Sequence, residues 1–540
     1  MTRYRHLITD ENRKWWTLGA MCFALFMIML DNTVVNVALP SIQRDLGASI
    51  SELEWTINGY TLSFAVLLAT GGRLGDIFGR RRMFLFGVVI FALSSATAGF
   101  AASSTDLVIS RVVQGVGAAL MMPATLSIVT DAFPAHERGK AMGTWAGVSA
   151  LALAVGPVLG GFLAEHVSWR AIFYLNIPVA VGAVLASLFA VRESRDRTVG
   201  REVDYPGVVV LTASLTGLIL ALVEGNSWGW GSTEIVALLV GAGIGMVAFV
   251  AIELRVKVPM VEFRFFSDRN FLGAVVVALI VSFSMLGVFF FLALYMQDVL
   301  AYSPLEAGVR FLPSTLMIVI LAPVAGRLAD RFGPRWLIAA GLAIVAASLY
   351  SFSGIAVDSS YGDLLPGFML LGAGIALTMS PMTSAAMNAV AVEKAGIASG
   401  VLSTFRMVGG SLGVAVTGAI FQGLIRSQLD IELAGSGVTA AQRSELAHQF
   451  GGGSVEMLHG MAPAQAKQVI AASQEAFVYA LGHAMTVSAA VALAGALIGA
   501  IAIRAKQRPL SGGAMEAALS PGGSDVAAQE AVAAGEPVRS

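Results

Sequence analysis

Charged residues divide the chain into long apolar segments. Thirteen stretches contain no Asp, Glu, Lys or Arg, and a fourteenth is interrupted only by Asp31. A helix needs about 20 residues to cross roughly 30 Å of hydrocarbon, and nearly all of the segments approach or exceed this length. Backbone groups in a bilayer must bond within the protein, so the pattern predicts an all-α integral membrane protein with fourteen spans. The segments are 17–39, 55–72, 83–105, 112–130, 141–164, 171–191, 206–223, 235–252, 271–297, 311–326, 336–357, 364–392, 407–425 and 476–503.

The basic residues indicate which way the segments cross the membrane. If the N-terminus is cytoplasmic, 26 of the 34 Lys and Arg residues fall on the cytoplasmic side and six fall outside. The other two, Arg111 and Arg406, lie within predicted spans. Cytoplasmic loops are enriched in basic residues, so both termini are predicted to be cytoplasmic. Arginine outnumbers lysine by 28 to 6, which favours a GC-rich bacterial source and therefore a bacterial cytoplasmic membrane.

Composition excludes several other classes of protein. Only 13% of the residues are charged and the mean hydropathy is +0.76, whereas soluble domains carry about 25% charged residues. Acidic and basic residues nearly cancel to a net charge of −1, so we expect no nucleic-acid partner. The six histidines lack the spacing of metal ligands, and the single cysteine, Cys22, allows no internal disulfide. We therefore expect no metal site.

Two similar loops indicate an internal repeat. Residues 72–81 read GRLGDIFGRR, and residues 326–335, 254 positions later, read GRLADRFGPR. Gly143, Gly156 and Gly161 of the 141–164 segment recur 257 positions later as Gly400, Gly413 and Gly418. The first six and last six spans are therefore predicted to be equivalent bundles in parallel orientation. Parallel repeats of this kind are typical of transporters that work by alternating access.

The repeat predicts how the chain is divided. The segment 426–475 is predicted to be an external loop, which either folds as a flap over the outer face or has no role in gating. The tail is rich in Ala, Gly, Ser and Pro and is expected to be disordered. The predicted parts are an N-terminal six-helix bundle (1–191), two inserted helices with their loops (192–270), a C-terminal six-helix bundle (271–507) and a cytoplasmic tail (508–540).

Four signatures resemble those of the major facilitator superfamily, and specifically of its fourteen-helix drug:proton antiporters. They are LDNTVVNVALP at 30–40, the 72–82 loop, RVVQGVG at 111–117, and Gly147 followed by GPVLGG at 156–161. The resemblance covers about residues 15–425 and the last span. It implies two six-helix bundles with two inserted helices, and export of hydrophobic, often cationic compounds. It also implies that the proton gradient supplies the energy without a cofactor, and that the protein works as a monomer.

Asp31 is the most informative single residue, because a carboxylate inside a membrane helix is costly and normally faces water or a partner. By helical rise Asp31 lies about 12 Å and Arg111 about 9 Å from the outer boundary, so the two can share one depth. Burial favours the protonated acid and a nearby arginine favours the carboxylate. These opposed effects suit a group that loads and releases a proton, and we predict proton coupling at this pair. The alternative is a static ion pair that fixes two helices.

The loop at 72–82 must turn sharply between two spans, and Asp76 is placed to cap the next helix or to pair with Arg80. In the resembled family this loop is a cytoplasmic latch that packs against the inner end of another helix. The alternative is that its arginines only set the topology. The predicted latch residues are Gly72, Asp76, Gly79, Arg80, Asp131, Arg138 and Asp330.

Two further groups of residues are candidates for the transport path. Small residues let the 141–164 helix approach a neighbour closely and bend, and in the resembled family this pattern marks exporters; ordinary packing is the alternative. The small residues concerned are Gly147, Gly156, Pro157, Gly160 and Gly161. Polar residues on apolar helices are predicted to line a substrate cavity, although His483 also suits a buried, hydrogen-bonded structural role. These polar residues are Asn32, Asn36, Asn58, Gln114, Asn176, Arg406 and His483.

The function predicted from the sequence is proton-coupled efflux of hydrophobic or cationic drugs by alternating access. A dedicated exporter of one endogenous antibiotic, lipid or metabolite is the main alternative, followed by a non-transporting membrane sensor. The sequence contains no phosphate-binding loop, no zinc-protease motif and no cluster of His and Cys. We therefore expect neither an enzyme nor direct use of ATP.

Overall fold

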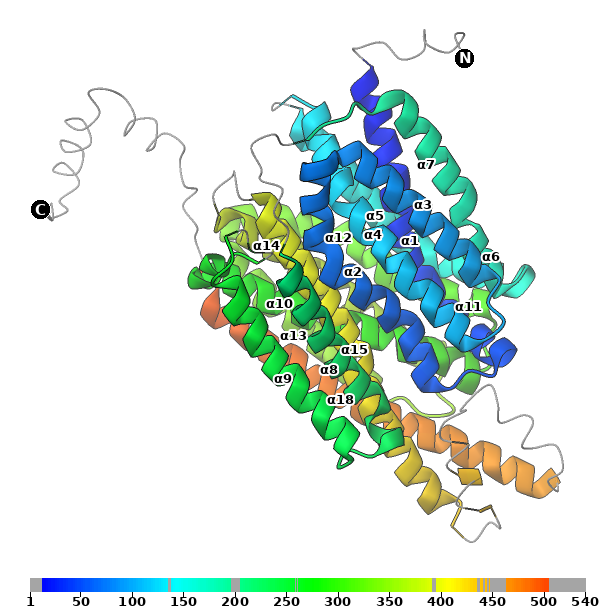
Figure 1. Cartoon of the computed structure of the whole chain (residues 1–540). Coiled ribbons are helices and arrows are strands. Elements are labelled where there is room, and N and C mark those ends of the chain that lie inside the picture. Colours follow the sequence, from blue (N-terminus) through cyan, green and yellow to red (C-terminus); the bar gives the residue numbers. More distant parts are fainter. Residues whose placement is uncertain are drawn as a thin grey trace, which may run out of the picture.

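The computed structural model describes residues 12–504 apart from 135–136, 196–203, 258, 260, 391–394, 435–437, 440–441, 444–445 and 447–462. Throughout these residues the regular elements are helices (Figure 1). Each of the fourteen predicted segments falls mainly in a helix or in a pair of consecutive helices, and 83–105, 336–357 and 364–392 run past the end of their helix. The predicted tail at 508–540 lies outside the described residues.

Many of the helices are longer than the charge-free segments, because they continue past the apolar stretch into polar ends. Their bounds are α1 (Arg13–Leu46), α2 (Ile50–Phe78), α3 (Arg80–Gly99), α4 (Ser104–Ala132), α5 (Arg138–His166), α6 (Trp169–Tyr174), α7 (Asn176–Ala190), α8 (Tyr205–Trp228), α9 (Thr233–Glu253), the 3₁₀ helix η2 (Phe263–Ser267), α10 (Arg269–Leu294), the π-helix η3 (Tyr295–Val299), α11 (Pro304–Arg310), α12 (Leu312–Phe332), α13 (Pro334–Phe352), α14 (Tyr361–Asn388), α15 (Ala395–Glu432) and α18 (Pro463–Ala502).

Length and apolarity identify the helices that can cross a membrane. In the described part of the chain, twelve helices or joined helix pairs qualify, and α2 is a thirteenth if its two arms, which meet at a bend of 50°, count as one span. The fourteenth predicted span, 141–164, lies in α5, which has 29 residues but, in the described part of the chain, is not among the helices that qualify. The predicted external loop at 426–475 is shorter than expected, because α15 continues to Glu432 and α18 already begins at Pro463. The helix α15 therefore continues past the apolar segment through charged residues such as Arg426 and Asp430.

The two related loops adopt the same turn in the structure. Gly79 separates α2 from α3 with φ of +111°, and Gly333 separates α12 from α13 with φ of +84°. Residues with a Cβ rarely adopt such values, so each loop requires glycine at this point. The repeat in the sequence thus corresponds to a repeated backbone geometry.

The repeat extends to the packing of the helices that follow each turn. Gly87 of α3 and Gly117 of α4 lie against each other's backbone, and a side chain on either would collide with the opposite helix. Gly341 of α13 and Gly374 of α14 form the equivalent contact. Small residues allow such close approach of membrane helices. Both bundles therefore contain the same close-packed helix pair.

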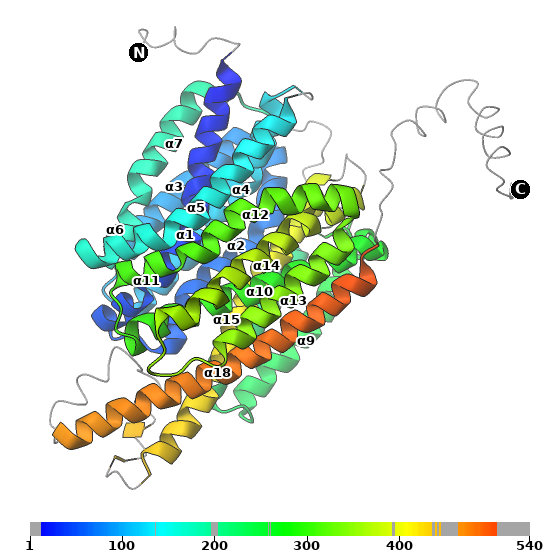
Figure 2. The same ribbon diagram turned by 180° about the vertical axis from the view of Figure 1, so that it is seen from behind.

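The helices form two groups that lie side by side in both views (Figures 1 and 2). We call α1–α7 the N bundle and α10–α15 with α18 the C bundle; α8 and α9 pack beside the C bundle, with α8 contacting α15 and α2. The inner end is where α1 and α3 begin, and the outer end is where α2 and α4 begin. These names follow the orientation predicted from the basic residues.

One hydrophobic core extends through the C bundle and continues into the outer half of the N bundle. This core joins Val34 and Leu39 of α1 to Phe289 of α10 and to Phe421 of α15. The inner half of the N bundle has a separate core, whose buried members all come from residues 18–191. The bundles are therefore joined by apolar packing toward the outer end of the molecule.

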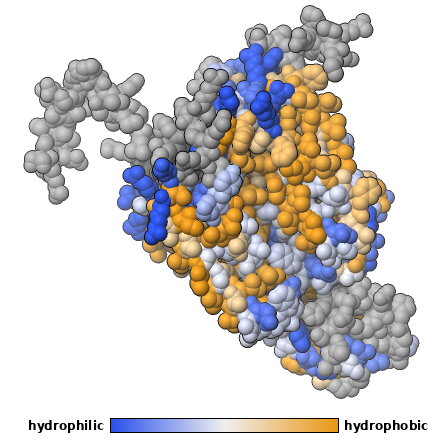
Figure 3. Space-filling model, viewed as in Figure 1, coloured by the Kyte–Doolittle hydropathy of each residue, from blue (hydrophilic) through white to orange (hydrophobic). Residues whose placement is uncertain are grey.

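The outside of the molecule is apolar in a broad band. On the face shown in Figure 3, apolar residues cover the middle and polar residues gather toward the inner and outer ends. Helix α9 is the clearest case, since Val240, Ile244 and Val247 are all more than half exposed. Such a surface is stable in lipid and would be costly in water.

Candidate functional site

The centre of the site is a buried ion pair within the N bundle. Asp31 of α1 is 0% exposed and Arg111 of α4 is 2% exposed. Arg111 Nη1 donates a hydrogen bond to Asp31 Oδ2 at 2.5 Å. The two residues that the sequence placed at similar depths are therefore in direct contact. A buried pair of this kind depends on further hydrogen bonds to offset the loss of hydration.

Those further hydrogen bonds come from α4 and α7. Gln114 Nε2 donates to Asp31 Oδ1 at 2.9 Å, and Asn176 Nδ2 donates to the same oxygen at 3.2 Å. Gln114 Oε1 in turn accepts from Arg111 Nη1 at 2.8 Å. Arg111 and Gln114 are three residues apart, which places them on one face of α4. We call Asp31, Arg111, Gln114 and Asn176 the Asp31 network.

Helix α2 holds the guanidinium group of Arg111 from the other side. Arg111 Nε donates to the carbonyl oxygen of Thr56 at 3.1 Å, and its guanidinium lies 4.2 Å from the centre of the Tyr60 ring. Such stacking of a cation on an aromatic face is favourable, and more so away from water. Arg111 is thus fixed independently of Asp31, and a proton that neutralised Asp31 would leave the arginine in place.

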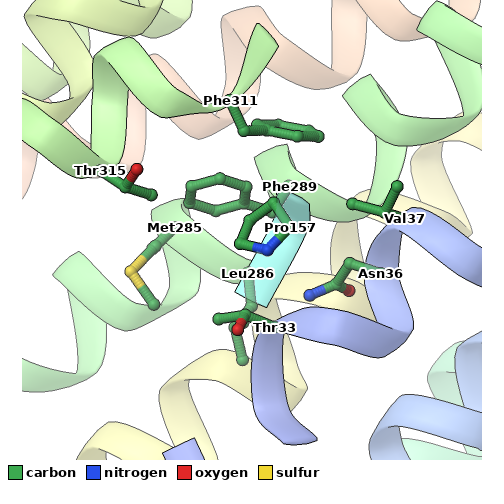
Figure 4. A pocket seen from close by; sticks show the side chains of 9 residues that line it. All are labelled: Thr33, Asn36, Val37, Pro157, Met285, Leu286, Phe289, Phe311 and Thr315. Atoms are coloured by element: carbon green, nitrogen blue, oxygen red, sulfur yellow. The ribbon is translucent and has the colours of Figure 1, made fainter. Parts of the chain in front are cut away.

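A small apolar pocket lies between the bundles, close to the Asp31 network along α1. Figure 4 shows Thr33, Asn36 and Val37 of α1 facing side chains of α10 and α12 across this space. Asn36 Oδ1 is buried without a hydrogen-bond partner. The full set of lining residues is Thr33, Asn36, Val37, Pro157, Met285, Leu286, Phe289, Phe311 and Thr315.

The structure distributes the other predicted cavity residues over several places. Asn32 donates to the carbonyl of Ile28, one turn back in α1. Asn58 of α2 accepts a hydrogen bond from Ser411 of α15 at 2.8 Å, so it links the two bundles. Gln114 and Asn176 belong to the Asp31 network instead of lining the pocket.

Two predicted cavity residues on the C bundle do not line this pocket. Arg406 lies half-buried in α15 and is not among the lining residues. His483 is exposed on α18, where its Nδ1 lies 2.9 Å from the carbonyl of Tyr479 in the preceding turn. Its placement in a cavity, and equally in a buried structural role, was wrong. Helical periodicity turns this histidine away from the neighbouring helices.

The predicted latch is a charged network at the inner end of the N bundle. Arg80 Nε donates to Asp76 Oδ1 at 3.0 Å, and Arg80 Nη1 donates to Asp131 Oδ2 at 2.7 Å. Gly72 of α2 packs against Pro123 of α4. The contacts connect α2, α3 and α4. The side chains of Arg138 and Asp330, which complete the predicted set, lie outside the described residues.

The segment after α7 also belongs to this network, although no motif in the sequence predicts this contact. Glu193 Oε1 accepts from the backbone N–H of Arg81 at 3.1 Å, and Ser194 O accepts from the backbone N–H of Arg80 at 2.8 Å. A Cβ on Gly79 would overlap the Glu193 carboxylate. Glu193 lies 112 residues after Arg81 in the sequence, so no local motif predicts that the two are in contact.

The glycines of α5 lie where the bundles meet. Gly156 packs on Thr33 and Gly160 on Val34, both of α1, whereas Gly161 packs on the backbone of α11 in the C bundle. In return, Gly308 of α11 packs on the carbonyl of Pro157. The fifth member of the motif, Gly147, has open space around the position of a Cβ, so close packing does not explain it.

A second buried acid escaped the sequence analysis. Glu54 of α2 is 0% exposed and accepts a hydrogen bond from Gln422 of α15 at 3.1 Å. The predicted segments contain no charged residue, so Glu54 falls just outside the segment 55–72 and is not among the predicted site residues. Its position four residues after Ile50, the first residue of α2, was the available signal, because it places the carboxylate inside the helix.

Comparison with known proteins finds one family whose model matches most of the chain. The family model described as Major Facilitator Superfamily matches residues 21–414. A tetracenomycin C resistance and export protein of Streptomyces glaucescens is 35% identical over 90% of this chain and 91% of its own length. A puromycin resistance protein of Streptomyces alboniger is 39% identical over 78% and 84%, respectively, and the multidrug resistance protein Stp of Mycobacterium tuberculosis is 35% identical over 80% of both chains.

Among solved structures, a bacterial homologue of the human lysosomal transporter Spinster, in an inward-facing and unoccupied conformation, has the same fold. Its TM-score is 0.61 at 17% sequence identity, and the match covers 91% of this chain and 98% of that chain. At this identity the match concerns the fold alone.

Proposed function

Because the chain belongs to the major facilitator superfamily, whose members similar to it are transporters and not enzymes, we propose that it is a proton-coupled exporter of small hydrophobic or cationic compounds. The proton gradient drives export without a cofactor or a nucleic-acid partner. The protein works as a monomer in the bacterial cytoplasmic membrane, with both termini in the cytoplasm. The predicted orientation and the Asp31 network support this proposal.

The observation that carries the proposal is the Asp31 network. Its carboxylate is fully buried and accepts hydrogen bonds from three side chains, one of them an arginine. A buried acid in a membrane helix is costly and is a functional candidate by default. To bind a proton, Asp31 must release Arg111, and Arg111 stays in place through Thr56 and Tyr60. Protonation therefore exchanges one defined arrangement of α1 and α4 for another.

Helix α1 connects this event to the substrate pocket. Thr33, Asn36 and Val37, which line the pocket, lie within two turns of Asp31 on the same helix. The pocket is small and lined mostly by apolar side chains, among them Phe289 and Phe311, so a hydrophobic compound would contact them once the bundles separate. Movement of α1 on proton binding changes the pocket directly. A cationic substrate competes with the proton for the same negative charge.

The joining of the bundles supports alternating access. The outer half of the N bundle shares a core with the C bundle while the inner half of the N bundle has its own, which is the arrangement expected of a transporter closed toward the outside. Rocking of one bundle against the other is the common mechanism for parallel repeats. In this state the Arg80 contacts with Asp76 and Asp131 stay within the N bundle.

The test uses proteoliposomes with an imposed pH gradient and ethidium as a hydrophobic cation. Asp31→Asn is expected to abolish gradient-driven accumulation while retaining exchange of ethidium in the absence of a gradient, because substrate movement then needs no proton. Asp106→Asn, at the exposed start of α4, is the control and should behave like the parent protein. Undiminished gradient-driven accumulation in Asp31→Asn would refute coupling at Asp31.

A dedicated exporter of a single product is the second candidate. Its support is the similarity, over 90% of the chain, to a protein named for tetracenomycin C resistance and export. Expression in a strain without its own pumps, followed by screening with dyes and several antibiotic classes, separates the two. Tolerance to one chemical class would favour the dedicated exporter, and tolerance to several would favour multidrug efflux.

A further inference from the structure

Glu54 lies in the second turn of α2, at the place where the outer ends of the N and C bundles meet. Its side chain is 0% exposed. Helix α15 approaches so closely that a Cβ on Gly418 would overlap the Glu54 carboxylate. The acid is thus sealed by the other bundle, whereas Asp31 is buried among helices of its own bundle. Separation of α2 from α15 would expose it to water.

The hydrogen bonds of Glu54 are incomplete in a specific way. Gln422 Nε2 donates to Glu54 Oε1 at 3.1 Å and to Ser51 Oγ at 3.3 Å. The remaining two acceptors, Glu54 Oε2 and Gln422 Oε1, are both buried without a partner. A carboxylate has no donor to offer, so it can form only one of the two hydrogen bonds that an acid and an amide can exchange. A proton on Oε2 supplies the missing donor.

No basic side chain in the described part of the chain pairs with Glu54. From α15 it faces the uncharged Gln422 and the backbone of Gly418, and the charged residue that acts on it from α8 is another acid, Glu224. On α2 itself, Glu52 is engaged by Ser104 of α4. A buried carboxylate without a counter-ion is unfavourable. The closed contact therefore favours the neutral acid.

We propose that Glu54 is a second proton-binding site, which takes its proton from the outer solution and thereby favours closure of the outer contact between α2 and α15. When the outer ends separate, the carboxyl group reaches water and releases its proton at neutral pH. Acid on the outer side returns the proton and stabilises the closed contact. The proposal rests on alternating access, but it does not depend on proton binding at Asp31.

The test measures the distance between the bundles at the outer end as a function of pH. In a Cys22→Ala background, spin labels on Val167→Cys of the N bundle and Asp358→Cys of the C bundle report that distance by double electron–electron resonance in nanodiscs. Both positions are exposed. One linked proton changes the ratio of closed to open molecules by up to about tenfold per pH unit. We expect the closed fraction to fall as the pH rises from 5 to 8.5.

The variant Glu54→Gln identifies the group that titrates. It keeps an uncharged side chain that can bond to Gln422, so the outer contact is expected to stay closed with no dependence on pH. Glu234→Gln, an exposed glutamate at the outer start of α9, is the matched control and should keep the response of the parent. A response in Glu54→Gln equal to that of the parent, or no response in the parent, would overturn the proposal.

Two more variants complete the test. One replaces Glu54→Gln if that variant does not fold, and the other separates proton binding at Glu54 from proton coupling at Asp31. If Glu54→Gln does not fold, Glu54→Asp keeps the charge and should shift the midpoint of the response, and an unchanged midpoint would contradict the assignment. Asp31→Asn should retain the pH response of the outer contact. Loss of gradient-driven export together with retention of this response shows that the two acids act separately.

Discussion

Asp31 and Glu54 are both fully buried acids in membrane helices, yet their surroundings differ in kind. Asp31 accepts three hydrogen bonds and pairs with Arg111, all from helices of the N bundle. Glu54 accepts one hydrogen bond, from the C bundle, and has an unpartnered oxygen. The negative charge of Asp31 is thus stabilised whichever way the bundles are placed. The state of Glu54 depends on whether the bundles touch.

The comparison teaches that burial alone does not assign a role to a membrane carboxylate. The role depends on whether the hydrogen-bond partners of the acid come from its own bundle or from the other bundle. An acid whose partners share its own bundle keeps its environment until its own helices move, whereas an acid whose partner lies across the interface reports directly on the conformational change. Substitutions that change the surroundings of only one of the two acids should therefore have different effects.

The largest effect is expected from Arg111→Leu. This change leaves Asp31 buried without its counter-ion, and removal of one partner from a buried pair costs about 3 to 5 kcal/mol. We expect a marked loss of thermal stability in detergent, measured by tryptophan fluorescence, together with loss of export. Arg443→Gln breaks an ion pair of 2.8 Å with Asp430 near the surface and should cost at most about 1 kcal/mol. Equal effects of the two changes would contradict the special status of the Asp31 network.

A moderate effect is expected from Gly418→Val. The added side chain would overlap the Glu54 carboxylate, and overpacking of this kind costs about 1 to 3 kcal/mol. Because the strain is relieved when the bundles separate, the cost should be seen as a larger open fraction in the spin-label experiment. Gly400→Val, in the same helix, meets open space and serves as the control. A closed fraction that is the same in both variants would show that α15 does not press on Glu54.

The smallest effect is expected from Asn176→Ala. Asp31 then loses one of its three donors, an uncharged amide at 3.2 Å, the longest of the three, and we expect a cost of about 1 kcal/mol, which is typical of a single hydrogen bond. We expect a small decrease in thermal stability with export retained. The pH response of the outer contact should not change, because Asn176 lies on the N bundle. A changed response would mean that the two acids are coupled.

Much of the fold follows from where charges are absent. The fourteen segments fall in helices because the bilayer admits few alternatives for an apolar stretch of this length. The contact of Asp31 with Arg111 was also accessible, since the rise of a helix converts position in the sequence into depth. Contacts across the bundle interface, such as that of Glu54 with Gln422, cannot be predicted from the sequence position alone. Position gives the depth of a residue in the membrane but does not identify the neighbouring helices.

Two errors have the same physical origin. His483 was assigned to a cavity because it is polar in an apolar helix, but the direction of a side chain around the helix axis is set by packing of α18 on its neighbours. Glu54 lies outside the predicted segment 55–72 because that segment begins after the last charged residue, although α2 begins at Ile50 and includes Glu54. In both cases, side-chain direction and partners decided the outcome, and neither is written in the local sequence.

The contact between α5 and α11 has a consequence for the evolution of substrate range. Gly161 and Gly308 bring the two helix backbones together, so this junction between the bundles depends little on side-chain chemistry. The pocket, by contrast, is lined by side chains such as Met285, Phe289 and Phe311. Substitutions at the pocket can therefore change its shape and polarity while the contact between the two helix backbones stays the same. If the pocket receives the exported compound, as proposed, the substrate range can change without a change in how the bundles are joined.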